Sequence, residues 1–136
     1  DYIVKKNREN YSIIESALLE IKGLKFRKVP SQCKPLCDTL IIQFDSKDMA
    51  NEFVVGMQNE GLGTKNVPDA IEWHFAKYWD HMLDSIEMNK AELKKSLSAS
   101  SEIIERCVAL PIMLKTSKKE IKEYIKILHK IIKPII

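Results

Sequence analysis

The chain has 136 residues, 45% hydrophobic and 30% charged, enough to bury one ordinary core but not two large domains. Its 22 Lys and Arg exceed its 19 Asp and Glu by three, too small an excess to predict a nucleic acid partner. No apolar run approaches the roughly 20 residues that cross a bilayer, so we expect no membrane partner. Three cysteines, an odd number, fit a reducing cytoplasm. We therefore expect one cytoplasmic domain over residues 1–136 and, because no initiator Met is present, a fragment of a longer protein.

The first part of the chain predicts two helices and two strands. Large apolar side chains recur every three or four residues and predict an amphipathic helix over 4–22. Residues 24–29 predict a short strand, and the run 38–44, apolar on both faces, predicts a central strand. Ser46 suits the N-cap of a second helix that Gly61 ends.

The middle of the chain predicts a returning strand and an aromatic helix. Residues 62–67 complete a strand, helix and strand unit in this interpretation, and Pro68 then opens a helix that reaches residue 82. Helical spacing places five large side chains of that segment on one face. They are Ile71, Phe75, Tyr78, Trp79 and Met82.

The last third alternates polar and apolar segments. The serine-rich region 89–101 predicts a solvated helix end and a loop, and 101–107 a short helix. Residues 108–114 predict a strand that Pro111 confines to an edge or a bulge. Thr116 is the expected N-cap of a final amphipathic helix with a lysine-rich solvent flank.

Residues 61–82 concentrate unusual chemistry. They hold both tryptophans, two of the three histidines and half of the glycines. Rings and titratable nitrogens in one short stretch suit the wall of a pocket for a flat or phosphorylated ligand. The alternative is that the rings anchor a core or an interface, and we rank this alternative above direct catalysis.

No complete active site is visible in the residues themselves. Cys33 and Cys37 have a spacing that two zinc ligands can use, but no second pair stands at a matching distance. The run 61–63 lacks the remainder of a phosphate loop. His74 and His81, without a carboxylate or cysteine partner, are a poor metal site. We therefore predict no catalytic residue and no metal site in this chain.

Several local sequences resemble one enzyme family together. The segments 8–11 (Arg-Glu-Asn-Tyr), 61–65 (Gly-Leu-Gly-Thr-Lys), 110–112 (Leu-Pro-Ile) and 116–121 (Thr-Ser-Lys-Lys-Glu-Ile) resemble the C-terminal domain of sugar aminotransferases of the DegT/StrS type. The resemblance covers nearly the whole chain. Residues 61–82 look most like the 8-amino-3,8-dideoxy-octulosonate transaminase branch, which aminates a lipopolysaccharide sugar.

This resemblance implies an α+β fold with a small, mainly antiparallel sheet flanked by helices, as in the C-terminal domain of fold-type I pyridoxal-phosphate enzymes. It implies that an absent large domain binds pyridoxal phosphate through a lysine upstream of Asp1, and that the full-length protein is a homodimer. The reaction implied moves an amino group from an amino acid, glutamate in most relatives, to a keto or aldehyde sugar. The isolated domain should be inactive.

The resemblance also implies which residues face the cofactor and substrate. His74 and Phe75 match a family position that carries a histidine or aromatic residue on that side, and Trp73 and His81 are weaker additions. The competing interpretation is a stand-alone, ferredoxin-like α+β binding or regulatory module, which the strand, helix and strand unit over 38–67 suggests. Such a module needs neither a cofactor nor an upstream domain.

Overall fold

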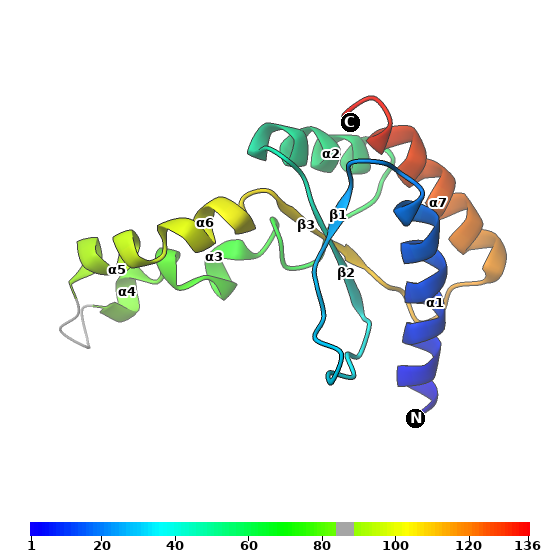
Figure 1. Cartoon of the computed structure of the whole chain (residues 1–136), viewed down its shortest axis with the longest axis horizontal. Coiled ribbons are helices and arrows are strands. Elements are labelled where there is room, and N and C mark those ends of the chain that lie inside the picture. The colour runs from blue at the N-terminus through cyan, green and yellow to red at the C-terminus, as the bar shows by residue number, and fades with distance from the viewer. Residues whose placement is uncertain (84–88) are drawn as a thin grey trace.

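The computed structural model describes residues 1–83 and 89–136 (Figure 1). Its helices are α1 (Tyr2–Leu19), α2 (Lys47–Asn59), α3 (Ile71–His74), the 3-10 helix η1 (Ala76–Tyr78), α4 (Asp80–Leu83), α5 (Lys90–Ser96), α6 (Ser98–Ile104) and α7 (Lys118–Ile132). Its strands are β1 (Lys25–Phe26), β2 (Thr39–Gln43) and β3 (Cys107–Pro111). Helices and a separate small sheet together confirm the predicted α+β class.

The three strands form one antiparallel sheet in the order β1-β2-β3. The apolar run of β2 takes the central position, as its sequence predicts. Ile42 lies opposite Phe26 on one side and Val108 on the other. Pro111, which has no N–H to donate, ends β3 at the edge of the sheet, in agreement with the prediction.

Three helices cover one face of the sheet and build the core with it (Figure 1). Leu40 and Ile42 alternate along β2 toward this face, where they meet Ile14 of α1 and Phe53 of α2. The helix α7 packs against both α1 and α2. The opposite face carries the half-buried alternate residues of β2.

The helices α2 and α7 approach closely at Gly56. A Cβ added there would lie 2.5 Å from Cγ2 of Ile131, a distance at which either the Ile131 side chain or the helices must shift. Ser46 caps α2, as predicted, because its side chain accepts a hydrogen bond from the backbone N–H of Met49.

We expect Gly56→Ala to lower the free energy of unfolding by about 1 kcal/mol. Overpacking a tight contact costs about 1–3 kcal/mol, and the better helix propensity of alanine offsets about 1 kcal/mol of that. Urea denaturation measures the difference. Gly63→Ala is the matched control, since a Cβ there meets nothing within 4 Å. A Gly56→Ala protein more stable than the wild type would contradict this close approach.

The predicted returning strand over 62–67 is wrong. The chain runs along the free edge of β3 but makes only two backbone hydrogen bonds there, both with Ala109. The N–H of Lys65 donates to the carbonyl oxygen of Ala109 at 2.8 Å, and the N–H of Ala109 donates to the carbonyl oxygen of Val67 at 2.9 Å. Pro68 has no N–H with which to extend this pairing.

The predicted aromatic helix over 68–82 is also wrong, because the segment breaks into α3, η1 and α4. Phe75 is extended at the first break, with φ −125° and ψ 119°. Aromatic residues have a low helix propensity. None of the described residues from 68 to 82 belongs to the core, so no packing contact with the core stabilises one continuous helix there.

Two further boundaries differ from prediction. Helix α5 occupies part of the predicted loop over 89–101, because Asn89 accepts hydrogen bonds from two N–H groups of its first turn. The final helix is capped by Ser117 instead of Thr116. Only Ser117 has a glutamate three residues later, and Glu120 returns a hydrogen bond to complete a capping box.

The described residues of 71–83 and 89–106 extend away from the sheet and its three helices, and we call them the arm (Figure 1). None of them belongs to the core. Glu105 joins the arm to the rest of the chain, because it pairs with Lys77 at 3.2 Å within the arm and with Lys47 of α2 at 3.4 Å. Lys77 also donates to the hydroxyl of Ser101, which is buried at the base of the arm.

Candidate functional site

A hollow of about 490 Å³ lies on the sheet face opposite α1, α2 and α7, and we call it the sheet hollow. Its floor is the outward side of β2 and β3, and its walls are the loop before β2 and the segment after α2. The residues that line it are Arg27, Pro35, Leu36, Cys37, Asp38, Thr39, Ile41, Asn66, Val67, His74 and Ala109. Side chains with N–H donors therefore gather over an apolar floor, an arrangement typical of small-molecule sites.

One ion pair holds the two walls of the sheet hollow together. Lys65 donates from Nζ to Oδ2 of Asp38 at 2.6 Å. This hydrogen bond lowers the pKa of Asp38. Both side chains remain partly exposed, so solvent screens the pair and its contribution to stability is small.

We expect Lys65→Met to remove a small, pH-dependent part of the stability. A carboxyl whose pKa is lowered on folding stabilises the protein above about pH 4, and this contribution is lost as the pH falls through the folded pKa. The variant should lose about 0.5 kcal/mol at neutral pH and differ progressively less from the wild type in acid. Urea midpoints across this range measure it, with the exposed Lys28→Met as control. A difference that does not shrink in acid would contradict the assignment.

The sheet hollow also holds the thiol of Cys37. Burial is the main cause that raises the pKa of Cys37 above its usual value, so the thiol is protonated. Its Sγ lies 3.7 Å from the carbonyl oxygen of Pro35, and its φ of 62° marks a tight turn. Burial likewise raises the pKa of Cys107.

The structure separates the four residues expected to face the cofactor and substrate. His74 lines the sheet hollow. Phe75 points its ring at Tyr78 in an edge-to-face contact, with centroids 6.1 Å apart. Trp73 and His81 line a different depression on the arm. Of these four residues, only His74 lines the sheet hollow. That His74, Phe75, Trp73 and His81 face the cofactor and substrate stays a prediction.

The depression on the arm is an exposed aromatic groove of about 480 Å³. Its residues are Glu72, Trp73, Tyr78, Trp79, His81 and Met82. Trp79 is held in place by its Nε1–H, which donates to the carbonyl oxygen of Glu72 at 3.1 Å. Trp73 is 81% exposed, which is unusual for so large an apolar ring and typical of an interface residue.

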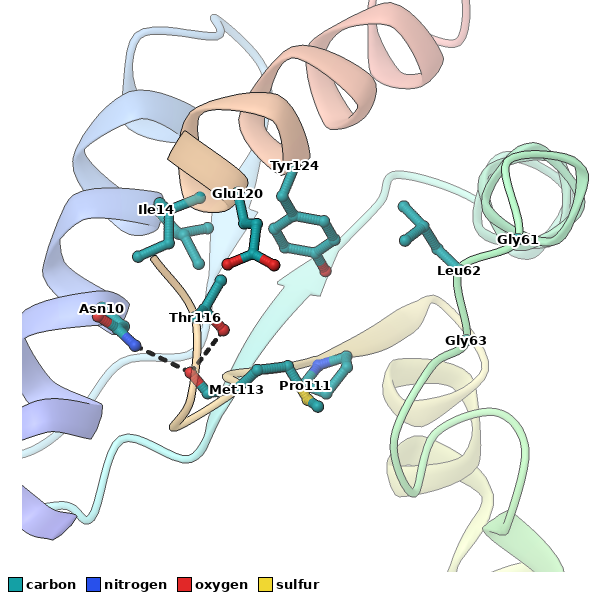
Figure 2. A pocket seen from close by; sticks show the side chains of 11 residues that line it. Asn10, Ile14, Gly61, Leu62, Gly63, Pro111, Met113, Thr116, Glu120 and Tyr124 are labelled. Carbon is teal, nitrogen blue, oxygen red and sulfur yellow. Dashed lines mark hydrogen bonds between the residues drawn. The ribbon is translucent and has the colours of Figure 1, made fainter. Parts of the chain in front are cut away.

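Sequence reasoning missed the other residues of the sheet hollow. Arg27 and Asn66 come from segments 39 residues apart, counted from their numbers, and no local spacing pairs them with His74. It also missed a cavity on the other side of the sheet edge, between α1 and α7 (Figure 2). Asn10 and Tyr124 line that cavity, and only the packing of their helices brings them together.

The described part of the chain shows no group of three or more His, Cys, Asp or Glu side chains placed to hold a metal ion. In the same residues, no helix is both long and apolar enough to cross a membrane.

Solved structures match this fold over almost its whole length. The aminotransferase TlmJ from Streptoalloteichus hindustanus matches 98% of this chain with a TM-score of 0.71 at 14% identity. The sugar aminotransferase Spr1654 from Streptococcus pneumoniae matches 98% in its PMP form, with a TM-score of 0.66 at 10% identity. Its PLP form matches with a TM-score of 0.63 at 12% identity.

These matches establish a shared fold. The chain spans about a third of the length of each of these proteins, at 32% of TlmJ and of both forms of Spr1654. No family model matches the sequence. No curated protein matches it either. The likeness is therefore between this chain and one part of larger aminotransferases.

Proposed function

We propose that this chain is the small C-terminal domain of a pyridoxal-phosphate-dependent sugar aminotransferase. The observation that carries the proposal is the fold match, which covers 98% of this chain and 32% of the length of the aminotransferase TlmJ and of the sugar aminotransferase Spr1654. The family resemblance of the sequence supports it independently. The ferredoxin-like alternative loses its basis, since the strand, helix and strand unit on which it rested is not formed by residues 62–67.

In this proposal the sheet hollow is one wall of the active site. The Arg27 guanidinium, the Asn66 amide and the His74 ring are donors that suit an anionic, phosphorylated or carboxylated ligand. His74 binds and orients the ligand edge that faces this domain, and the apolar floor excludes water behind it. We assign these residues to binding and positioning.

The residues of the sheet hollow fit one side of the cofactor and substrate but not a complete cofactor site. When bound, pyridoxal phosphate supplies the electron sink for amino-group transfer. Lys65 adjoins the hollow, but its ammonium group is engaged by Asp38 at 2.6 Å. Following the family resemblance, we assign the lysine that bonds the cofactor to a large domain encoded upstream of Asp1.

The finer assignments rest on the sequence. Glutamate as amino donor and a keto or aldehyde sugar as acceptor come from the family resemblance of the whole chain. The octulosonate branch, with its link to lipopolysaccharide, comes from the likeness of residues 61–82. We also propose that the full-length protein is a cytoplasmic homodimer. In this proposal the exposed groove around Trp73 and His81 lies near the active site and contacts the large domain or the second subunit.

The visible absorbance of the full-length protein tests this function. We expect the full-length protein to show the cofactor's visible band, and we expect L-glutamate to convert it to the near-ultraviolet band of the amine form. Adding a keto or aldehyde sugar should restore the visible band. A start codon close to Asp1, or a protein that shows no such band after incubation with pyridoxal phosphate, would rule the proposal out.

A further inference from the structure

The charges of the sheet hollow leave one guanidinium group unpaired. Arg27 lines the hollow and is exposed, and its guanidinium has no hydrogen-bond or ion-pair partner in the described part of the chain. Asp38 is the one carboxylate among the described lining residues, and Lys65 pairs with it at 2.6 Å. Arg8 is also engaged, because its Nε donates to the carbonyl oxygen of Pro35 at 3.0 Å. The Arg27 guanidinium is therefore left to attract an anion.

Arg27 and Asn66 lie at opposite sides of the floor of the hollow. The backbone N–H of Arg27, just after β1, donates to the carbonyl oxygen of Ile41 on β2 at 3.2 Å. Ile41 lies opposite Ala109 of β3, and the residues on either side of Asn66 hydrogen-bond to Ala109. Three steps of about 4.8 Å therefore separate the backbones of Arg27 and Asn66. An arginine side chain extends over part of that span, and the rest suits a ligand of about the length of a sugar.

The lining favours a carboxylate over a phosphate. A carboxylate carries one negative charge, which one guanidinium matches with two parallel hydrogen bonds. Phosphate sites typically add a helix N-terminus or a glycine-rich run of backbone N–H groups. The described lining residues include no glycine, and the one that belongs to a helix, His74, is the last residue of α3. This lining therefore matches a singly charged group better than a doubly charged one.

We propose, building on the proposed function, that the sheet hollow binds a substrate that carries a carboxylate. Arg27 binds this carboxylate, and Asn66 and His74 hydrogen-bond to neutral polar groups of the same molecule. Arg27 is then the residue that selects an acidic substrate over a neutral one. The carboxylate belongs either to a sugar acid or to the amino acid that donates the amino group.

Ligand-observed NMR titrations of the full-length protein test this carboxylate site. D-glucuronate, D-glucose and D-glucose 6-phosphate share a sugar frame and differ in one group, which is a carboxylate, a hydroxyl or a phosphate. Glutarate represents the amino acid, since it has the carboxylates of glutamate without the amine. We expect at least one of the two carboxylate probes to bind with a Kd of about 1 mM, and more tightly than glucose 6-phosphate.

Three variants isolate the role of Arg27. Arg27→Gln removes the charge and should raise the Kd of the bound carboxylate probe roughly tenfold without weakening the binding of glucose. Arg27→Lys keeps the charge but not the planar fork and should give an intermediate Kd. Lys28→Gln removes a neighbouring exposed cation that does not line the hollow and should change no Kd. Both positions are exposed, so the urea midpoints of all three variants should match that of the wild type.

The two carboxylate probes separate the two sources of the carboxylate. A Kd for glucuronate that depends on Arg27 assigns it to a sugar acid, and a Kd for glutarate that depends on Arg27 assigns it to the amino acid. If glucose 6-phosphate binds more tightly than both carboxylate probes, the site does not prefer a carboxylate. If neither carboxylate probe binds, or if Arg27→Gln leaves both Kd values unchanged, Arg27 does not bind a carboxylate. Either result would overturn the proposal.

The titrations need no turnover and no cofactor band, so they are independent of the absorbance test of the proposed function. A protein that binds glucuronate through Arg27 but shows no cofactor band would contradict the aminotransferase function and support the carboxylate site. A protein that shows the band and the glutamate response but binds neither carboxylate probe through Arg27 would contradict the carboxylate site alone.

Discussion

In the full-length protein, His74→Ala is expected to lower kcat/KM for amino-group transfer by roughly 10- to 100-fold, with the fold unchanged. The reason is that His74 is the ring of the sheet hollow whose nitrogens can reach a ligand on the open sheet face. It is exposed, so its removal leaves no gap in the core. Single-turnover kinetics with L-glutamate and with the sugar measure the loss in each half of the reaction.

Two control variants separate the loss of the His74 hydrogen bond from a nonspecific effect of shortening a side chain. His74→Gln keeps a hydrogen-bonding side chain and should retain more activity than His74→Ala. Val55→Ala shortens an exposed side chain of α2 that does not line the sheet hollow and should retain wild-type activity. Wild-type kcat/KM in His74→Ala would contradict the placement of the sheet hollow in the active site.

Phe53→Ala is expected to lower the free energy of unfolding by about 3–5 kcal/mol, the largest stability effect that we predict. Phe53 is fully buried, and its ring packs on Phe44 with centroids 5.2 Å apart. The truncation therefore removes apolar contacts at the junction of α2 with the sheet and leaves a cavity that close-packed neighbours cannot fill. Guanidinium denaturation measures the change.

Val55→Ala is the matched control on the same helix. Val55 lies on the solvent side of α2 and is 53% exposed, so its truncation should change the stability by less than about 0.5 kcal/mol. Similar losses in Phe53→Ala and Val55→Ala would show that α2 does not present Phe53 to the core.

The parts of the fold that follow from local patterns could be predicted from the sequence. The apolar run of β2 indicated a central strand, and it pairs on both sides. Ser46 indicated a helix start, and its side chain caps α2. In both cases the residues that decide the structure lie within a few positions of one another, so a single sequence carries the signal.

The parts that failed depend on contacts between distant segments. Residues 62–67 follow a helix and precede Pro68, a position that suggested a returning strand, but they make only two backbone hydrogen bonds with β3. The segment 68–82 has helical spacing, but no described residue of it is packed into the core, so nothing holds it as one helix. Tertiary packing determines the structure of both segments, and the spacing of residues in the sequence does not reveal that packing.

In the candidate site, too, the sequence predicted what depends on neighbouring residues and missed what depends on contacts between distant segments. The concentration of rings and histidines in residues 61–82 drew attention to His74, which does lie in a hollow. The same reasoning grouped His74 with Trp73 and His81, which the structure puts in a separate groove. Arg27 reaches the sheet hollow because β1 pairs with β2. The spacing of residues in the sequence does not predict that Arg27 and His74 lie in the same hollow.

A structure of the full-length protein with pyridoxal phosphate bound would show whether the sheet hollow forms part of the active site. We expect the sheet face that carries the hollow to lie against a large cofactor-binding domain, with the His74 ring within about 4 Å of the bound ligand or of a group that contacts it. If that face points into solvent and His74 is remote from the cofactor, the sheet hollow is not part of the active site.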